Sequence, residues 1–382
     1  KEGVAILKKG SLNIVFNNGH LFLNWKERLV TPGLGVYTIL ATANKHYNSN
    51  QADWSIIREE ENNLTVIGKF AQLGINQIWE LELDNNHSLK WSIEIDSDKS
   101  IEISECYTNI MLINEYSRWF TSIDNGLFPA IDGKNMNWLP LLDANLPRKL
   151  IGAEAKKDSD WEIPSLVFKQ TSDTLLSSAQ IFNTDYAATC RVLQYKTVGL
   201  NNKLLSFQAS RHVIFSGKII LGIPDTANYL NNLDNNFVLS KGALRLVFAN
   251  GRCLLSYNGL NLTKSSHMNS SIYTGKECLD SISAHWEVKK ENKDTIIARG
   301  VWPGVPITQV WIIEMLSDSN FLWKINLEVN GEINIHEQRA QLMCVGGYEN
   351  YFSDYDSGVF SNNFLMVEKD LLQRCIPDGL IG

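Results

Sequence analysis

Hydrophobic and polar residues alternate with a period of two along much of this chain, and short turn signals interrupt the alternation. Leu12, Ile14 and Phe16 alternate with Asn13 and Val15, and Asn17-Asn18-Gly19 then leads into a second apolar run that ends at Trp25. Both residues of an Asn-Gly turn tolerate positive φ, so alternation on both sides of it predicts a β-hairpin. The same pattern recurs around Asn250-Gly251.

More short strands are predicted between turns rich in Gly, Asn and Asp. They cover residues 54–57, 64–70, 76–83, 88–95, 101–106 and 107–113, with counterparts from 286 to 344, and a middle group lies within 160–225. No stretch keeps a helical period over twelve residues. Many short strands at this spacing indicate an all-β fold of antiparallel β-sandwiches with few helices.

The chain also contains much of itself twice, at a nearly constant offset of 232 positions. Gly10 to Phe16 reappears as Gly242 to Phe248. Other residues repeat in the same register: Trp54, Gly68, Gln77, Trp79, Trp91, Glu105 and Phe128 match Trp286, Gly300, Gln309, Trp311, Trp323, Glu337 and Phe360. A register held this long predicts a tandemly duplicated sandwich. A slip of one residue would turn every core side chain outward.

The repeat gives the expected domain organisation. The first copy spans 1–232, with additional strands in 160–225, and the second spans 238–382 after a polar linker at 228–236. Pro147 to Gly152 resembles Pro377 to Gly382 at an offset of 230. The second copy is therefore either truncated or naturally shorter than the first. Because the chain opens at Lys1 without an initiator Met, we expect it to be a region of a larger protein.

Composition removes several classes of function. The 382 residues include 35 basic and 42 acidic side chains, for a net charge of −7, and neither sign forms a block. A nucleic-acid partner is therefore not expected. No apolar run approaches the roughly 20 residues that a membrane span needs. The six cysteines are scattered without a C-x-x-C pair, which favours free thiols, no metal and a cytoplasmic location. Nucleotide-binding glycine motifs are absent, so no cofactor is expected.

The density of strands over residues 10–230 resembles the supersandwich proteins of the galactose mutarotase-like group. That resemblance implies a β-sandwich architecture and a carbohydrate-related role. Members of the group use a His acid in an Asn-His-x-x-Phe-Asn segment and a late Glu base. Asn86-His87-Ser88 lies at a predicted turn without the rest of that pattern, so no catalytic residue is carried over.

Repeated side chains are interpreted first as structural. The six shared tryptophans sit in strands beside aliphatic residues, so we expect them in the core. Gln77 and Gln309 are expected to be satisfied polar groups on the opposite pleat or near a sheet edge. Glu105 and Glu337 each follow an apolar strand and are expected to face solvent.

The side chains that differ between the copies are the candidates for ligand binding. Arg118 and Trp119 precede a segment that is predicted as a loop. This segment contains Asp124 and Trp138. A guanidinium beside an aromatic ring suits a sugar that stacks on the ring and accepts hydrogen bonds. The corresponding candidates in the second copy are Trp302 and Tyr351. An Arg stem packed over a half-buried Trp is the structural alternative.

These observations favour a carbohydrate-recognising region of a polysaccharide-related protein, with a role in binding or substrate positioning rather than catalysis. The partner would be an oligosaccharide or polysaccharide. One alternative is a sugar-modifying enzyme of the mutarotase-like group, an epimerase or lyase. Another is a structural spacer or a dimerisation platform, and the sequence leaves self-association open.

Overall fold

A computed structural model of the chain shows the architecture. It describes residues 3–85, 87–122, 125–130, 139–142, 150–155, 162–171, 177–184, 189–198, 204–231, 236–275, 277–302, 304–345, 348–352 and 357–359. The chain divides into two compact units, unit 1 (Lys1–Asn236) and unit 2 (Phe237–Gly382). Nearly all regular structure is antiparallel β-strand, which confirms the all-β prediction.

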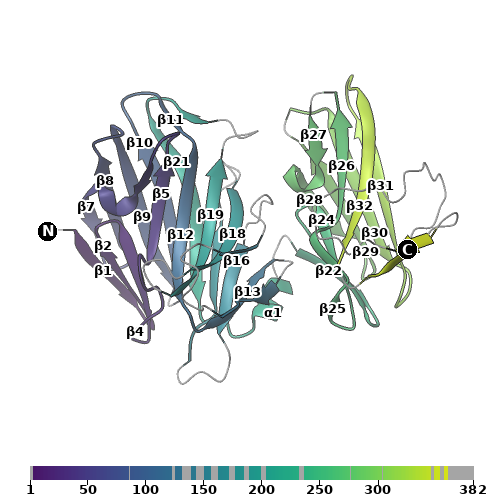
Figure 1. Cartoon of the computed structure of the whole chain (residues 1–382), viewed down its shortest axis with the longest axis horizontal. Coiled ribbons are helices and arrows are strands. Elements are labelled where there is room, and N and C mark those ends of the chain that lie inside the picture. The colour runs from purple at the N-terminus through teal and green to yellow at the C-terminus, as the bar shows by residue number, and fades with distance from the viewer. Residues whose placement is uncertain are drawn as a thin grey trace. The chain divides into compact units, whose positions relative to one another are not determined.

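Unit 1 is built from two large sheets, here called sheet A and sheet B. Within the described residues sheet A has ten strands, of which β5, β12, β19 and β18 are neighbours in Figure 1. In spatial order, sheet A contains β1 (Val4–Lys9), β2 (Leu12–Asn17), β3 (His20–Trp25), β5 (Val36–Ala41), β12 (Glu105–Ile113), β19 (Cys190–Val198), β18 (Ser177–Thr184) and β15 (Leu139–Leu142), with β4 (Arg28–Leu29) beside β3 and β6 (His46–Asn48) beside β5.

Sheet B has nine strands among the described residues. They run in the order β14 (Asn125–Leu127), β13 (Tyr116–Thr121), β16 (Leu150–Ala155), β17 (Leu166–Gln170), β21 (Arg211–Leu221), β10 (Ser88–Asp96), β9 (Ile75–Asn85), β8 (Asn63–Phe70) and β7 (Asp53–Glu59). The smaller elements of unit 1 are the pair β11 (Ile101–Ile103) and β20 (Leu205–Phe207), the 3-10 turn η1 (Ser49–Gln51) and the helix α1 (Thr226–Asn231).

Unit 2 repeats the first half of this arrangement. Its seven-stranded sheet, counted over the described residues, contains β22 (Asn236–Lys241), β23 (Leu244–Ala249), β24 (Arg252–Tyr257), β26 (Thr263–Thr274) and β27 (Cys278–Asp280), with β25 (Leu260–Asn261) beside β24 and β32 (Ile335–Cys344) beside β26. The second sheet of unit 2 has four strands in the described ranges, namely β28 (His285–Lys290), β29 (Thr295–Val301), β30 (Ile307–Met315) and β31 (Phe321–Val329). The turn η3 (Ser281–Ser283) and the pair β33 (Asn350–Phe352) and β34 (Ser357–Val359) complete it.

Strand register and hydrogen bonds repeat at the predicted offset. Trp54 lies opposite Gly68 in unit 1, and Trp286 lies opposite Gly300 in unit 2. The Trp54 indole N–H donates to the carbonyl oxygen of Ser49 at 2.6 Å, and the Trp286 indole N–H donates to that of Ser281 at 2.7 Å. Two segments that share both register and side-chain contacts have the same local fold.

An aromatic cluster forms the centre of each repeat. The ring centroids of Trp79 lie 4.8 Å from Trp54 and 5.2 Å from Trp91, with edge-on geometry. In unit 2, Trp311 lies 5.0 Å from Trp286 and 4.9 Å from Trp323. All six tryptophans are in a hydrophobic core or pack against it, which confirms their structural assignment.

The expectation for Gln77 and Gln309 was wrong about the pleat. Both are fully buried, because residues two apart on a strand share a face and each Gln precedes a core Trp by two positions. Their amide oxygens accept hydrogen bonds from Thr38 at 2.9 Å and from Ser270 at 2.7 Å. These hydrogen bonds join the two sheets within each unit.

No helix in the described part of the chain is long and apolar enough to cross a membrane.

Candidate functional site

Arg118 and Trp119 lie in strand β13, and the downstream segment that the sequence predicted as a loop contains strand β14. β13 forms a hairpin with β14, in which Trp119 lies opposite Gly126. A Cβ atom at Gly126 would sit 2.5 Å from the indole, so the missing side chain makes room for this ring. Trp119 is only 9% exposed and packs in the core of unit 1, while Arg118 is exposed on the outer face of sheet B. The Trp119 ring therefore serves the core and is not presented as a stacking platform, and Arg118 lies on the opposite face rather than over the ring.

The other candidates are dispersed. Trp302 is 5% exposed, and its indole N–H donates to the backbone oxygen of Asp280 at 3.0 Å. Tyr351 belongs to β33, but its side chain lies outside the described part of the structure, as do Asp124 and Trp138. Among the candidates that the structure describes, only Arg118 offers a polar group to solvent. A ligand contact by the rest of the set stays a prediction.

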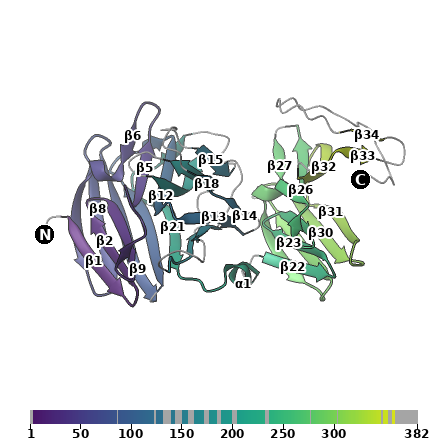
Figure 2. The ribbon, with the colours of Figure 1, turned by 60° about the horizontal axis from the view of Figure 1, so that its bottom comes forward.

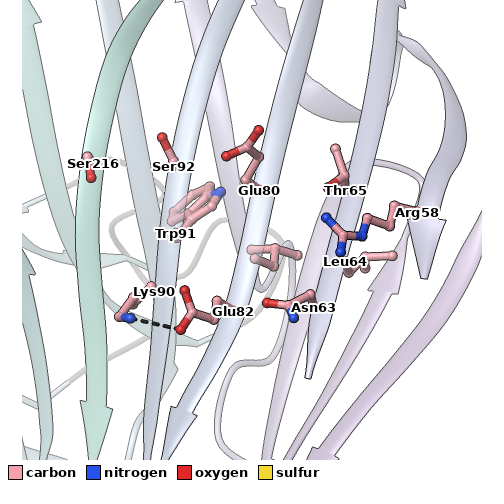
Figure 3. Close-up of a pocket in the computed structure, with 11 residues that line it drawn as sticks. Arg58, Asn63, Leu64, Thr65, Glu80, Glu82, Lys90, Trp91, Ser92 and Ser216 are labelled. Carbon is pink, nitrogen blue, oxygen red and sulfur yellow. Dashed lines mark hydrogen bonds and ion pairs between the residues drawn. The ribbon is translucent and has the colours of Figure 1, made fainter. Parts of the chain in front are cut away.

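The outer face of sheet B carries a depression that the sequence analysis missed. It has a volume of about 360 Å³ and lies over β7, β8, β9, β10 and β21. Figure 3 shows the side chains that line it. The polar ones are Arg58, Asn63, Thr65, Glu80, Glu82, Lys90, Ser92 and Ser216, and we call this set the charged depression. Trp91, whose side chain belongs to the core, also borders it.

Ion pairs hold the charged groups of this face in place. The Lys90 ammonium lies 2.8 Å from a Glu82 oxygen, the contact drawn in Figure 3, and Arg211 lies 2.9 Å from Glu80. Asp84, next in the row, is 2.9 Å from Lys218. The hydrogen bond from Lys218, with the charges of Lys218 and Lys90, lowers the pKa of the Asp84 carboxyl. The Asp84 carboxylate therefore acts as a hydrogen-bond acceptor, and the Glu80 and Glu82 carboxylates accept hydrogen bonds from Arg211 and Lys90.

Three polar positions of the lining are specific to the first copy. Thr65, Glu80 and Lys90 correspond at the 232 offset to Ile297, Ile312 and Leu322 in unit 2. Those positions lie on β29, β30 and β31, the counterparts of β8, β9 and β10. The rest of the strand lining stays polar in unit 2, where Glu82 corresponds to Glu314 and Arg58 to Lys290. The shared fold therefore does not require Thr65, Glu80 and Lys90.

A second polar cluster lies on the outer face of sheet A around Glu105. Lys196, on β19, places its ammonium 2.6 Å from the Glu105 carboxylate, and the Tyr107 hydroxyl donates to the same carboxylate. The His46 ring lies 6.3 Å from the Tyr107 ring. Glu105 is half-buried, so the expectation of a solvent-facing glutamate holds only in part for the first copy. In unit 2, Glu337 is exposed, as expected.

The pKa directions in this cluster oppose proton transfer near neutral pH. Partial burial raises the pKa of the Glu105 carboxyl, but hydrogen bonds from Lys196 and Tyr107 outweigh it and leave the pKa below its usual value. Burial, followed by the hydrogen bond to Glu105, raises the pKa of the Tyr107 phenol. A general acid or base needs a pKa near the working pH. The pKa of Glu105 is lowered and that of Tyr107 is raised, so both move away from neutral pH. The two side chains therefore suit a fixed hydrogen-bonding role.

No group of three or more His, Cys, Asp or Glu residues that could hold a metal ion occurs in the described ranges.

The charged depression could have been found from the sequence by examining the pleat opposite the tryptophans. Glu80, Glu82 and Asp84 alternate with core residues on one strand, and Lys90 and Ser92 flank Trp91 on the next. The period-two rule places them on one face.

No family model and no curated protein matches the chain. Solved structures of polysaccharide lyases are similar to part of it. Heparan sulfate lyase HepC from Pedobacter heparinus has 11% identity and a TM-score of 0.37, over 69% of this chain and 42% of the lyase. A mutant of that lyase has 9% identity and a TM-score of 0.35, over 68% and 42%.

A heparinase III with methylated lysines has 6% identity and a TM-score of 0.35, over 85% of this chain and 41% of that one. The chain thus spans about two fifths of the length of these structures. Likeness at these TM-scores is too coarse to assign a function, and it does not bear on the mutarotase-like group.

Proposed function

We propose that unit 1 binds carbohydrate, without catalysing its conversion, at the charged depression on sheet B. The observation that carries the proposal is the contrast between the copies. Thr65, Glu80 and Lys90 stand where unit 2 has Ile297, Ile312 and Leu322 on equivalent strands. The shared fold does not need these three polar groups, which makes them the candidates for contact with a ligand.

The mixture of donors and acceptors favours a polyhydroxylated ligand. Arg58 and Lys90 donate, Glu80 and Glu82 accept, and the hydroxyl and amide groups of the lining do both. Each sugar hydroxyl also donates and accepts, so it matches a lining of both kinds. A purely anionic ligand would face the two glutamates, and an apolar ligand would find few exposed apolar side chains. A depression of about 360 Å³ is at the lower end of small-molecule sites.

The depression lies on the outer face of sheet B, and Arg118 is exposed on the same face at β13. Between them this face carries Phe120, Leu150, Val167 and Ile220, which pack with Tyr229 and Leu230 of α1. We therefore confine the proposed site to the charged depression.

Catalysis by a mutarotase-like epimerase or lyase is the less supported alternative. Glu80 and Glu82 lie two residues apart on one strand, about 6.6 Å along it, and that separation is compatible with paired-carboxylate chemistry. However, Glu80 is paired with Arg211 and Glu82 with Lys90. Both carboxylates already accept hydrogen bonds from these cations.

The proposal is tested by calorimetric titration of the chain with oligosaccharides chosen from a glycan array. Wild type should bind, and Lys90→Ala and Glu80→Gln should each weaken binding by roughly 10-fold through the loss of one charge-assisted hydrogen bond. Lys324→Ala is the matched control, since Lys324 is exposed on the equivalent sheet of unit 2. Arg118→Ala in the same series tests the expected contribution of that residue.

Thermal melts of each variant separate binding from folding, because Glu80 is exposed and Lys90 is partly exposed, so both should contribute little to stability. Absence of binding by wild type to any glycan, or affinity that survives both Lys90→Ala and Glu80→Gln, would overturn the proposal. Turnover of a bound oligosaccharide, detected by a change in its reducing ends or unsaturation, would favour the enzymatic alternative.

A further inference from the structure

Strand β32 leaves an open edge in unit 2 that its counterpart closes in unit 1. β32 pairs with β26 on one side, beside which it lies in Figure 2, and the described residues provide no strand on the other. All ten residues of β32 are exposed. In unit 1 the equivalent strand β12 lies between β5 and β19. An unpaired edge of this length is a template for pairing with another strand.

Apolar side chains accompany the open edge. Leu342 is 54% exposed, whereas its counterpart Ile110 is fully buried, and Met343 is 45% exposed where Met111 is fully buried. Unit 2 therefore exposes residue types that unit 1 buries, at positions where the described residues of unit 2 include no counterpart of β19.

Unit 1 also shows what kind of side chain the covering strand supplies. β19 pairs antiparallel with β12, with Lys196 directly opposite Tyr107. The Lys196 ammonium lies 2.6 Å from the Glu105 carboxylate. The neighbouring strand thus brings a cation to the glutamate that begins β12. In unit 2 the equivalent glutamate is Glu337, whose described ionic contact is Arg339 on its own strand, at 2.5 Å.

We infer that two copies of this chain associate through antiparallel pairing of β32 with β32 across a two-fold axis. The charge pattern of the strand selects the register. With the axis at Gln338, residues 335–341 of each chain pair, and Glu337 faces the partner subunit's Arg339 twice in the dimer. An axis at Arg339 or at Glu337 would face like charges, which disfavours those registers. A two-fold axis makes the interface self-complementary and closed.

The resulting dimer extends the seven-stranded sheet of one subunit into that of the other by pairing the two β32 strands over residues 335–341, with Leu342 and Met343 just beyond the paired stretch. Each Glu337 receives a cation from a neighbouring strand, as Glu105 does in unit 1. The inference concerns unit 2 alone, so it does not depend on carbohydrate binding by unit 1.

Sedimentation equilibrium of the whole chain tests the inference with two single variants. Wild type should be dimeric at micromolar concentration. Glu337→Arg places Arg against Arg339, and Arg339→Glu places Glu against Glu337. Each variant alone should raise the dimer dissociation constant by about 10-fold or more. An equimolar mixture should restore dimers of wild-type strength, because every residue 337 then faces an opposite charge at residue 339.

Arg299→Glu is the matched control. It reverses one member of the exposed Arg299–Glu328 pair on the other sheet of unit 2, and should leave dimerisation unchanged. Restoration by mixing also shows that both single variants are folded. A monomeric wild type, dimers that persist in both single variants, or a mixture that stays monomeric would each overturn the inference. A monomeric wild type would point instead to an edge covered by another protein or by another segment of its own chain.

Discussion

The two copies share a folding unit but differ in how completely they bury it. Trp91 in unit 1 is almost fully buried, because β10 is followed in sheet B by β21. Its counterpart Trp323 is half-buried on β31, the last described strand of its sheet. The aromatic cluster and inter-sheet hydrogen bonds are nevertheless the same. The repeated residues therefore specify the local fold, while the middle segment of unit 1 determines how far the core is shielded.

The largest expected difference between the copies comes from removing equivalent tryptophans. Trp91→Ala should cost about 3–5 kcal/mol of unfolding free energy, through lost transfer energy and a cavity. Trp323→Ala should cost about 1–3 kcal/mol, because its ring keeps part of its contact with water. Hydrogen exchange of the whole chain under increasing urea, followed on peptides covering β10 and β31, measures the two losses separately. Equal losses of unfolding free energy in the two variants would contradict the difference in burial between Trp91 and Trp323.

Substitutions at equivalent glycines should have similar effects, because each glycine packs against the corresponding Trp of its own copy. A Cβ atom at Gly68 would lie 2.6 Å from the Trp54 indole, and one at Gly300 would lie 2.7 Å from the Trp286 indole. Gly68→Ala and Gly300→Ala should each destabilise their unit by about 1–3 kcal/mol, because the indole must shift to admit a methyl group. The same exchange measurement on β8 and β29 gives both values. A loss in one copy without a loss in the other would show that the shared contact is not equivalent.

The smallest expected difference between the copies is in how their stability depends on acidic pH. The pKa of Glu105 is below its usual value of 4.5 in the folded chain, so its contribution to stability is present above that value. That contribution is lost as the pH falls through the folded pKa. Glu105→Gln should therefore reduce the acid sensitivity of unit 1, by less than about 1 kcal/mol because the pair is partly solvated.

Urea unfolding between about pH 6 and pH 3 measures this effect, and Glu337→Gln is the matched comparison. The hydrogen bond from Arg339 lowers the pKa of Glu337 as well, but that pair is solvent-exposed. Its effect should vanish in about 0.5 M salt, where exposed charges are screened, while part of the Glu105 effect remains. Equal salt sensitivity at both glutamates would contradict the difference in burial.

Strand positions, core tryptophans and the duplication could all be predicted from the sequence. They depend on period-two alternation and on turn chemistry, which act between neighbouring residues. The same rule, applied two residues before Trp79, would have placed Gln77 in the core, and applied to Glu80, Glu82 and Lys90 it would have shown a common polar face. These were within reach of the sequence.

Only the tertiary structure decided which strands lie side by side. Lys196 reaches Glu105 because β19 pairs with β12, and Arg211 reaches Glu80 across β10, although each pair is distant in sequence. Trp119 is buried because Gly126 lets a hairpin close over it. Alternation specifies which face a side chain takes, but lateral pairing between distant strands depends on the whole core. For that reason the sequence determined the repeated unit and the polar face of β9 and β10, and the tertiary structure decided the ion pairs between distant strands and the edge position of β32.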